Sequence, residues 1–358
     1  MTAALRICLI ASSRFPIAEP FAGGLEAHTH SLASELMRRG HEVTLFAAPG
    51  SDPGLGVTEI DVEPFSSSPA ARADVGARPE QWMREHHAYL KLMLDLSRNP
   101  GRYDIVHNNS LHHLPVAMAE ATGLPFVTTL HTPPVPWLES AAMLASPSLT
   151  YASVSRHTAR AWSHVVDSAV IRNGVDTSRW MPGPGGGSAI WFGRLVPEKA
   201  PHLAIRAAHE AGVSIDLAGP ILDQSYFDAE IAPLLDDRTR YIGHLRHEQL
   251  MRAVGRASVS VVTPDWDEPY GLVAAESLAS GTPVAAFARG GVPEIVDERS
   301  GRLAAPGDVA GLGKAMIEAA QLSRDEARHR AVTSCSLERM VDDYELLYDV
   351  MIESEIAA

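Results

Sequence analysis

Short apolar runs alternate with helix-like stretches twice along the chain, and this repeat limits the available folds most. In the front half, strands are expected over residues 5–11, 42–47, 103–107, 126–131, 151–155 and 170–172, with a helix over 24–39. In the back half, strands are expected over 189–192, 214–218, 241–242, 259–262 and 283–287, with helices over 200–211 and 248–256. Because the runs are apolar on both faces, they predict parallel sheets covered by helices.

The two halves are separated by the run WMPGPGGG, residues 180–187, which no regular element tolerates. The chain has 358 residues, more than one ordinary domain needs. We therefore expect an α/β protein with two doubly wound, Rossmann-like domains facing each other across a cleft, residues 1–175 and 176–336. A helix from 337 carries an apolar stripe, and we expect the segment of about 337–358 to pack back on the front domain. Residues 64–82 are expected to form a long loop.

Composition excludes several classes of partner. The net charge of −14 argues against nucleic acid. No apolar run reaches the ~20 residues of a membrane helix, and no basic cluster favours an anionic membrane, so membrane association is not expected. The start of the chain predicts a first strand rather than a signal peptide. With Cys8 and Cys335 expected as free thiols, the sequence points to the cytoplasm.

The stretch DEPYGLVAAES holds Glu268 and Glu276, with seven residues between them. A glycosidase pair is one interpretation, but eight helical residues span ~12 Å, whereas glycosidase carboxyls lie roughly 5–9.5 Å apart. Pro269 biases Glu268 away from helical angles. Glu268 therefore belongs to a loop and Glu276 to a helix that begins near Gly271.

A helix that begins at a glycine offers unpaired N–H groups to an anion, and the backbone can approach closely. A phosphate there would place Glu276 about 7 Å further along the axis, a distance suited to a ribose. Carboxylates accept hydrogen bonds from vicinal hydroxyls. Glu276 is then expected to hold a ribose, and Glu268 the sugar beyond the phosphates. Two ordinary glutamates near an exposed turn are equally compatible with the spacing.

The stretch from Glu268 to Glu276 resembles the E-x7-E signature of retaining glycosyltransferases of family 4, which have the two-domain GT-B fold. Other motifs match in the order of that family: Gly23-Gly24, THTPP around His131, NGVD from Asn173, FGRLVPEK with Arg194 and Lys199, and GGVPE from Gly290. The resemblance covers nearly the whole chain and implies a metal-independent hexosyltransferase that uses a nucleotide-diphosphate sugar and no cofactor.

The resemblance also implies residue roles. Arg194 and Lys199 would neutralise the donor diphosphate, Glu268 would face the sugar hydroxyls, and His131 would touch the transferred sugar. The remaining substrate-binding residues that it implies are Gly23, Gly24, Asn173, Gly243, His244, Leu245, Tyr270, Gly271, Leu272, Val273 and Glu276. The segment Gly243–Leu245 would read the base; the resemblance favours UDP over GDP, and no residue decides between them.

Two patterns invite a metal. Asp265-Trp266-Asp267 is a D-x-D, but it adjoins residues already assigned to the phosphates. The histidines near His131, including His107, fit no usual zinc spacing. No metal site is therefore predicted.

Acceptor specificity is expected from the front domain, with His107 and Trp137 as candidates, and a small molecule or glycan is favoured over a lipid. A nucleotide-sugar epimerase of the same architecture, or a non-catalytic sugar-nucleotide binding protein, remains an alternative.

Overall fold

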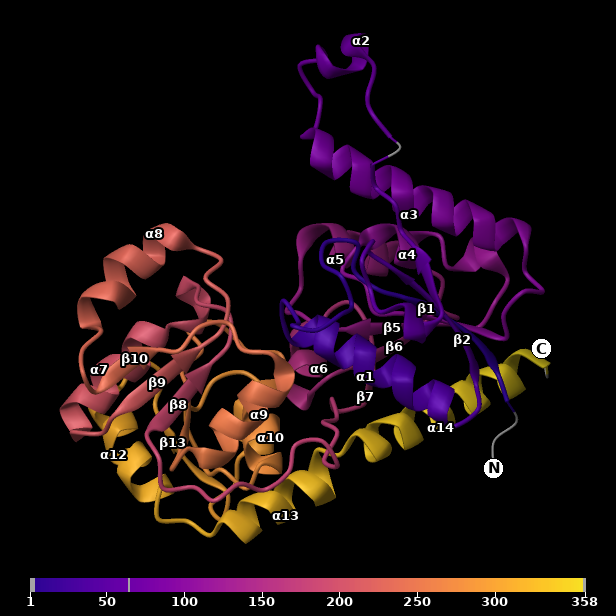
Figure 1. Cartoon of the computed structure of the whole chain (residues 1–358). Coiled ribbons are helices and arrows are strands. Elements are labelled where there is room, and N and C mark those ends of the chain that lie inside the picture. The colour runs from indigo at the N-terminus through magenta and orange to yellow at the C-terminus, as the bar shows by residue number, and fades with distance from the viewer. Residues whose placement is uncertain (1–3, 64, 357–358) are drawn as a thin grey trace.

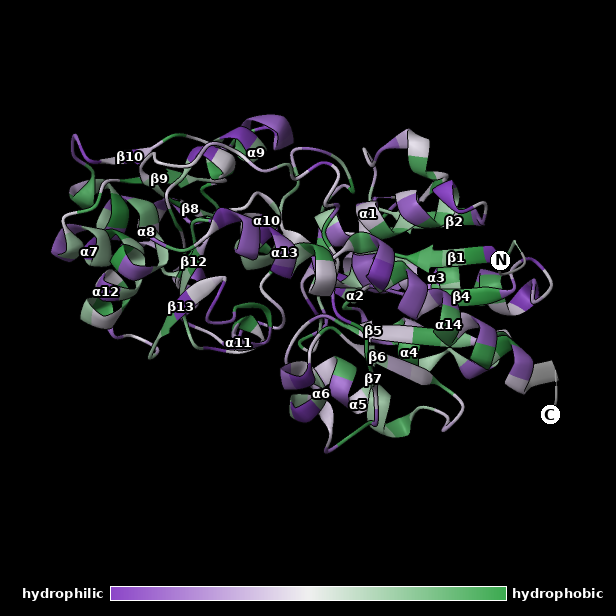
Figure 2. Cartoon of the chain, turned by 90° about the horizontal axis from the view of Figure 1, so that it is seen from below, coloured by the Kyte–Doolittle hydropathy of each residue, from purple (hydrophilic) through white to green (hydrophobic). Residues whose placement is uncertain are grey.

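The computed structural model describes residues 4–63 and 65–356, and it contains two domains that each hold one all-parallel sheet (Figure 1). The predicted fold class, two doubly wound parallel sheets, is confirmed. In Figure 2 most strand residues are coloured as hydrophobic, whereas the helices around the sheets carry both polar and apolar residues. This is the pattern expected of sheets that are covered on both faces.

The front sheet has the strand order β3-β2-β1-β4-β5-β6-β7. Its strands are β1 (Arg6–Ile10), β2 (Glu42–Ala47), β3 (Val57–Glu59), β4 (Ile105–Asn108), β5 (Phe126–Leu130), β6 (Thr150–Ser153) and β7 (Ala169–Val170). The helices of this half are α1 (Gly24–Arg38), α2 (Pro69–Arg72), α3 (Glu80–Arg98), α4 (His113–Ala117), α5 (Pro136–Leu144) and α6 (Arg156–Trp162). The order reverses between β1 and β4, and ligands of such sheets bind beyond the strand ends at a reversal.

The back sheet has the order β10-β9-β8-β11-β12-β13 and reverses between β8 and β11. Its strands are β8 (Ala189–Phe192), β9 (Ile215–Ala218), β10 (Thr239–Tyr241), β11 (Ser260–Val262), β12 (Val284–Phe287) and β13 (Gly301–Ala304). Its helices are α7 (Pro201–Ala211), α8 (Gln224–Tyr226), α9 (His247–Arg256), α10 (Leu272–Ala279), α11 (Val292–Ile295), α12 (Val309–Ala319) and α13 (Arg324–Ser334).

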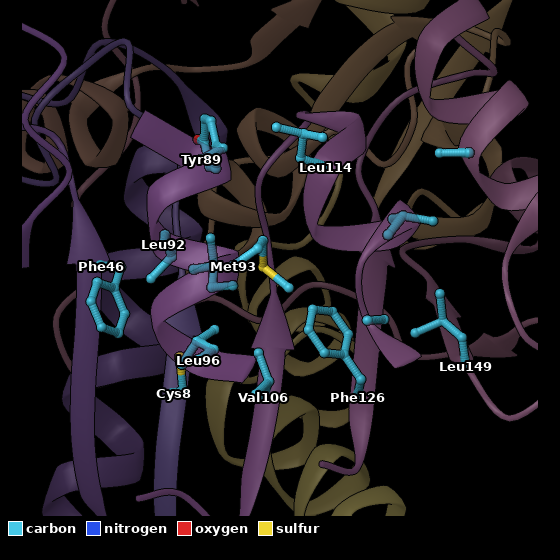
Figure 3. Close-up of a cluster of buried hydrophobic side chains, with 14 of the residues drawn as sticks. Cys8, Phe46, Tyr89, Leu92, Met93, Leu96, Val106, Leu114, Phe126 and Leu149 are labelled. Carbon is cyan, nitrogen blue, oxygen red and sulfur yellow. The ribbon is translucent and has the colours of Figure 1, made fainter. Parts of the chain in front are cut away.

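One face of the front sheet packs against α3. Phe46, Met93, Val106 and Phe126 meet there in a buried cluster (Figure 3). The side chains come from β2, α3, β4 and β5, so burial of their apolar surface fixes the helix over the middle of the sheet.

The other face of the front sheet is covered by α1 and by the last helix, α14 (Leu337–Ile356). Tyr344 and Tyr348 are fully buried against the sheet. Arg39, at the end of α1, donates to Asp342 and Glu345 of α14, both at 2.6 Å. The chain end therefore belongs structurally to the front domain (Figure 1).

The chain crosses between the domains twice, through adjacent segments. The N–H of Val175 donates to Cys335 O at 2.8 Å, and the N–H of Leu337 donates to Val175 O at 2.9 Å. The glycine-rich run 180–187 is not the crossing point. It is strapped to the back domain, where Arg324 donates to the carbonyls of Gly183 at 3.2 Å and Gly255 at 2.8 Å.

Some elements differ from the expectation. Residue 64 lies outside the described residues, and residues 65–82 of the expected loop contain α2 and the start of α3. Ser68 caps α2 by accepting from Ala71 N at 3.2 Å. The short strands β3 (VTE) and β13 (GRLA) were not predicted, since neither is a continuous apolar run. Within the described part of the chain, no helix has both the length and the hydrophobicity required to cross a membrane.

Candidate active site

A cleft of about 380 Å³ lies between the domains, where the loops after β1, β4 and β5 face the loops after β8 and β11. The ends of β1, β4, β8 and β11 lie beside the two reversals in strand order, where the topology predicts a ligand. The front domain contributes Gly23, Gly24 and His131, and the back domain contributes the loop that carries Glu268.

Lys199 and Glu268 form an ion pair in the cleft, with Lys199 Nζ donating to Glu268 Oε2. The indole Nε1 of Trp266 donates to the same carboxylate oxygen at 3.0 Å. The ammonium also lies 5.1 Å from the centre of the Trp266 ring, a cation–π contact. Both charged side chains are largely buried, with 22% and 15% of their surface exposed. The cleft therefore holds a cation and an anion fixed by one tryptophan.

The loop of Glu268 is supported from behind by the glycine pair of the GGVPE motif. Gly291 N donates to Glu268 O at 2.6 Å. Gly290 has φ +63°, and a β-carbon there would collide with the backbone of Glu268. Close backbone approach is thus the physical reason for glycine at this place.

Helix α10 begins at the cleft, with Gly271 as its N-cap residue at φ +107°. Leu272 and Val273 line the cleft in its first turn. The front domain comes very near this point, because a β-carbon on Gly24 would lie 3.1 Å from Leu272 Cδ1. The unpaired N–H groups of α10 therefore face the loop that opens α1.

Arg194 lies in the loop after β8 and reaches across to the front domain. A β-carbon on Gly23 would lie 3.8 Å from Arg194 Cδ, so the two motifs meet. The guanidinium of Arg194 lies 3.7 Å from the carboxylate of Glu198. Its charge also acts on Glu26, where it opposes the rise in pKa that burial causes. The cleft thus carries two cations, Arg194 and Lys199, beside a helix N-terminus.

Glu276 lies on α10 between the main cleft and a second cavity of about 210 Å³. Its side chain keeps a partial opening to these cavities, yet the surrounding protein excludes most water. This burial raises the pKa of Glu276 to about 8. The carboxyl is therefore positioned to bind hydroxyl groups, and most molecules carry it in the protonated, uncharged form near neutral pH.

His131 follows β5, and its Nε2 lies 2.8 Å from Asn109 Oδ1. The ring of His28 packs edge-on against it at 4.9 Å between centroids. Burial, reinforced by the neighbouring His28 and His107, holds the pKa of His131 well below its usual range. The imidazole at the cleft is therefore neutral and can donate or accept a hydrogen bond.

The other predicted binding residues lie around this centre. His244, Leu245 and Asn173 line the cleft, and Tyr270 contributes to its wall while its ring is buried in the back-domain core. Gly243 does not line the cleft itself, but its carbonyl oxygen accepts a hydrogen bond from the N–H of Gly219, which does, at 3.0 Å. The structure therefore brings together residues that lie far apart in sequence, with Gly243 at the edge of the group.

His107 does not lie on the acceptor side. Its side chain is fully buried, with Nδ1 2.6 Å from Tyr348 Oη and Nε2 2.8 Å from Thr129 Oγ1. The expectation that it contacts an acceptor is therefore corrected: His107 joins the sheet to α14. Trp137 lies on α5 of the front domain and is 52% exposed, outside the residues that line the cleft.

The D-x-D motif is engaged by an arginine. Arg289 lies 2.7 Å from Asp265 and 3.4 Å from Asp267. Across residues 4–63 and 65–356, no group of three or more histidine, cysteine or acidic side chains is arranged to hold a metal ion.

Sequence reasoning missed Trp266 and the contacts that tie the Glu268 loop to the front domain. The carbonyl of Pro269 accepts from Ser155 Oγ at 2.5 Å and Thr158 Oγ1 at 3.1 Å. No sequence signal identifies these partners, because they lie more than a hundred residues away. For Trp266, its place two residues before Glu268 was the available signal.

Comparison with known proteins shows which families and relatives this chain resembles. The family described as "Glycosyltransferase Family 4" matches residues 22–179, and "Glycosyl transferases group 1" matches residues 187–334. Glycogen synthase of Mycobacterium tuberculosis (strain H37Rv) is 30% identical over 338 residues, which cover 82% of this chain and 81% of that protein. D-inositol 3-phosphate glycosyltransferase of Mycolicibacterium smegmatis is 27% identical, covering 91% of this chain and 87% of the relative.

Solved structures agree on the fold. AviGT4, a glycosyltransferase involved in avilamycin A biosynthesis, has a TM-score of 0.71 at 24% identity, covering 98% of both chains. Anabaena HepE in complex with UDP-glucose has a TM-score of 0.73 at 18% identity, covering 99% of this chain and 100% of that one. Both similarities concern the two-domain architecture.

Proposed function

The chain belongs to glycosyltransferase family 4, and from that premise we propose that it is a retaining hexosyltransferase that uses a nucleotide-diphosphate sugar. We propose UDP rather than GDP as the carrier, and a small molecule or glycan as the acceptor. The observation that carries the proposal is the meeting of Arg194, Lys199 and Glu268 beside the start of α10 in one cleft. HepE, whose structure holds UDP-glucose, supports this choice of donor.

In the proposed reaction, the bond between the sugar C1 and the diphosphate oxygen breaks while the acceptor oxygen bonds to C1 from the same face. The leaving diphosphate gains negative charge and takes the acceptor proton. Arg194, Lys199 and the N–H groups of α10 are fixed before the reaction, so they stabilise that charge where it develops. The same cations make a metal ion unnecessary in this proposal.

Lys199 has two roles in this scheme. Without donor, its ammonium neutralises Glu268. A donor diphosphate competes for that ammonium, which frees the Glu268 carboxylate to accept hydrogen bonds from the sugar hydroxyls. Glu276, five residues into α10, then accepts from the ribose.

A thermal-shift panel of UDP, GDP, ADP and TDP sugars tests the donor, because a ligand that binds the native state raises its melting temperature. Turnover is then compared for Lys199→Ala and for Lys314→Ala, whose ammonium is exposed on α12. We expect Lys199→Ala to lower kcat at least ~100-fold and Lys314→Ala to leave it unchanged. Equal kcat in both variants would refute the site.

Product analysis distinguishes the alternatives. Nuclear magnetic resonance of the product should show the anomeric configuration of the donor. Interconversion of donor sugars in the absence of any acceptor would instead indicate an epimerase.

A further inference from the structure

Four aromatic rings gather on the front domain beside the cleft, from three elements far apart in sequence. We call Trp82, His86, His113 and Trp137 the ring cluster. Trp82 lies 5.2 Å from His86 and 6.3 Å from His113, nearly parallel to both. Trp137 lies 5.5 Å from His113 and 5.8 Å from Trp82. The plane of the Trp137 ring is tilted by 33° to that of His113 and by 50° to that of Trp82, so the four rings form a corner rather than a flat stack.

The cluster lies at the cleft edge of the front sheet. His113 follows β4, Trp137 follows β5, and Trp82 is in the first turn of α3, which begins on the same side as α5 (Figure 1). The carboxyl ends of parallel strands are where ligands bind. Leu111 lines the cleft two residues before His113, so the cluster continues the cleft wall.

The cluster is held rigidly from behind. His112 stacks on Tyr89 at 4.3 Å and on His113 at 4.4 Å. The Tyr89 hydroxyl donates to Ala11 O at 2.9 Å, in the loop after β1. Arg14 of that loop lines the cleft and pairs with Glu85 of α3 at 3.3 Å. One network therefore fixes both the cleft loop and the cluster.

Packing alone does not explain the cluster. Trp137 is 52% exposed although Arg78 Cζ lies 5.9 Å from the centre of its ring, and Trp82, His86 and His113 are each only partly buried. The Nδ1 atom of His86 is buried without a hydrogen-bond partner. Large rings with exposed surface and an unsatisfied nitrogen are features of a binding surface rather than of a core.

We propose that the ring cluster is the acceptor subsite and that it binds a carbohydrate, resting on the proposed glycosyltransferase function. The apolar face of a sugar ring can lie on an indole, as at Trp137. Its hydroxyl edges need groups that both donate and accept, which neutral imidazoles provide. Burial lowers the pKa of His86 and His113, which favours that neutral form. A purely aromatic acceptor would leave the imidazole nitrogens unpaired.

The test uses the full-length protein, saturated with UDP, on a printed array of soluble glycans. We expect the wild type to bind a set of glycans and Trp137→Ala to bind them at least tenfold more weakly, with partial rescue in Trp137→Tyr. Leu144→Ala is the matched control, since it is an exposed apolar residue two turns along α5. It should bind as the wild type does.

The strongest glycan from the array then serves as acceptor in kinetics. We expect Trp137→Ala to raise the acceptor KM at least tenfold and Leu144→Ala to leave it at the wild-type value. Absence of glycan binding by the wild type, equal binding by Trp137→Ala, or transfer only to a parallel panel of phenols would each overturn the proposal. A missing UDP thermal shift with intact Trp137-dependent glycan binding would instead count against the proposed function.

Discussion

The carboxyl of Glu276 provides a decisive test of the nucleotide side of the cleft. Burial on α10 raises its pKa to about 8, so most molecules carry a neutral acid at pH 7. A ribose that donates both of its vicinal hydroxyls needs two acceptor oxygens, which only the ionised carboxylate provides. Nucleotide binding should therefore favour the ionised form and tighten as the pH rises.

The magnitude follows from that pKa. About one eleventh of the molecules are ionised at pH 7 and about ten elevenths at pH 9. If only the ionised molecules bind the ribose, the Kd for UDP falls about tenfold from pH 7 to pH 9. This corresponds to ~1.4 kcal/mol of binding free energy. The terminal phosphate of UDP, with a second pKa near ~6, is already ionised over this range.

Isothermal titration calorimetry of UDP at pH 7, 8 and 9 measures the effect. The Glu276→Gln variant has no group to ionise, so its Kd should vary by less than about twofold over the range. Glu248→Gln, at an exposed glutamate of α9, is the matched control and should follow the wild type. A wild-type Kd that stays constant or rises with pH would refute the reasoning, and so would a Glu276→Gln variant that follows the wild type.

The same shift affects stability without ligand, with a definite sign. The pKa of Glu276 is about 8 in the folded chain, above the ordinary value of 4.5. Between these two pH values the folded chain therefore binds more protons than the unfolded chain. Stability therefore falls as the pH rises from about 5 to 8, by ~2 kcal/mol after allowing for solvent in the cleft. Glu276→Gln should lose that component of the pH dependence in thermal melts.

Three further substitutions test other parts of the structure. Trp266→Phe keeps the ring but removes the N–H that fixes Glu268, so kcat should fall about tenfold with little change in donor KM; an unchanged kcat would exclude a positioning role. Arg324→Met removes the donor shared by Gly183 O of the linker and Ala257 O of the back domain, and it should cost about 3 kcal/mol, measured as a lower melting temperature. Tyr348→Phe removes the hydrogen bond to His107 and should cost about 1–2 kcal/mol, with kcat unchanged; a large loss of kcat would return His107 to the active site.

Several features of the site could be predicted from local rules. Pro269 excludes Glu268 from the helix, and Gly271 lets α10 begin beside it, so the division of the two glutamates between loop and helix was available from the sequence. Loops after strands could likewise be assigned to the ligand side of each sheet. These inferences depend only on backbone sterics and on strand direction.

Residues whose roles depend on a distant partner could not be predicted in this way. His107 carries the same sequence signal as a cleft histidine, but α14 returns from 241 residues away to bury it. Residues 180–187 were expected only to separate the two halves of the chain, whereas Arg324 binds this run to the back domain. In both cases a polar side chain is satisfied by an element whose position no local pattern encodes.

The sequence by itself determined the alternation of strands and helices, the two parallel sheets and the residue types available for phosphate and hydroxyl groups. Only the tertiary structure decided that Lys199 meets Glu268 across 69 positions, that Gly24 approaches Leu272, and that four rings gather beside the cleft. Periodicity reports which side of an element is buried. It does not report what buries it, because that depends on strand order and on how the two domains pack.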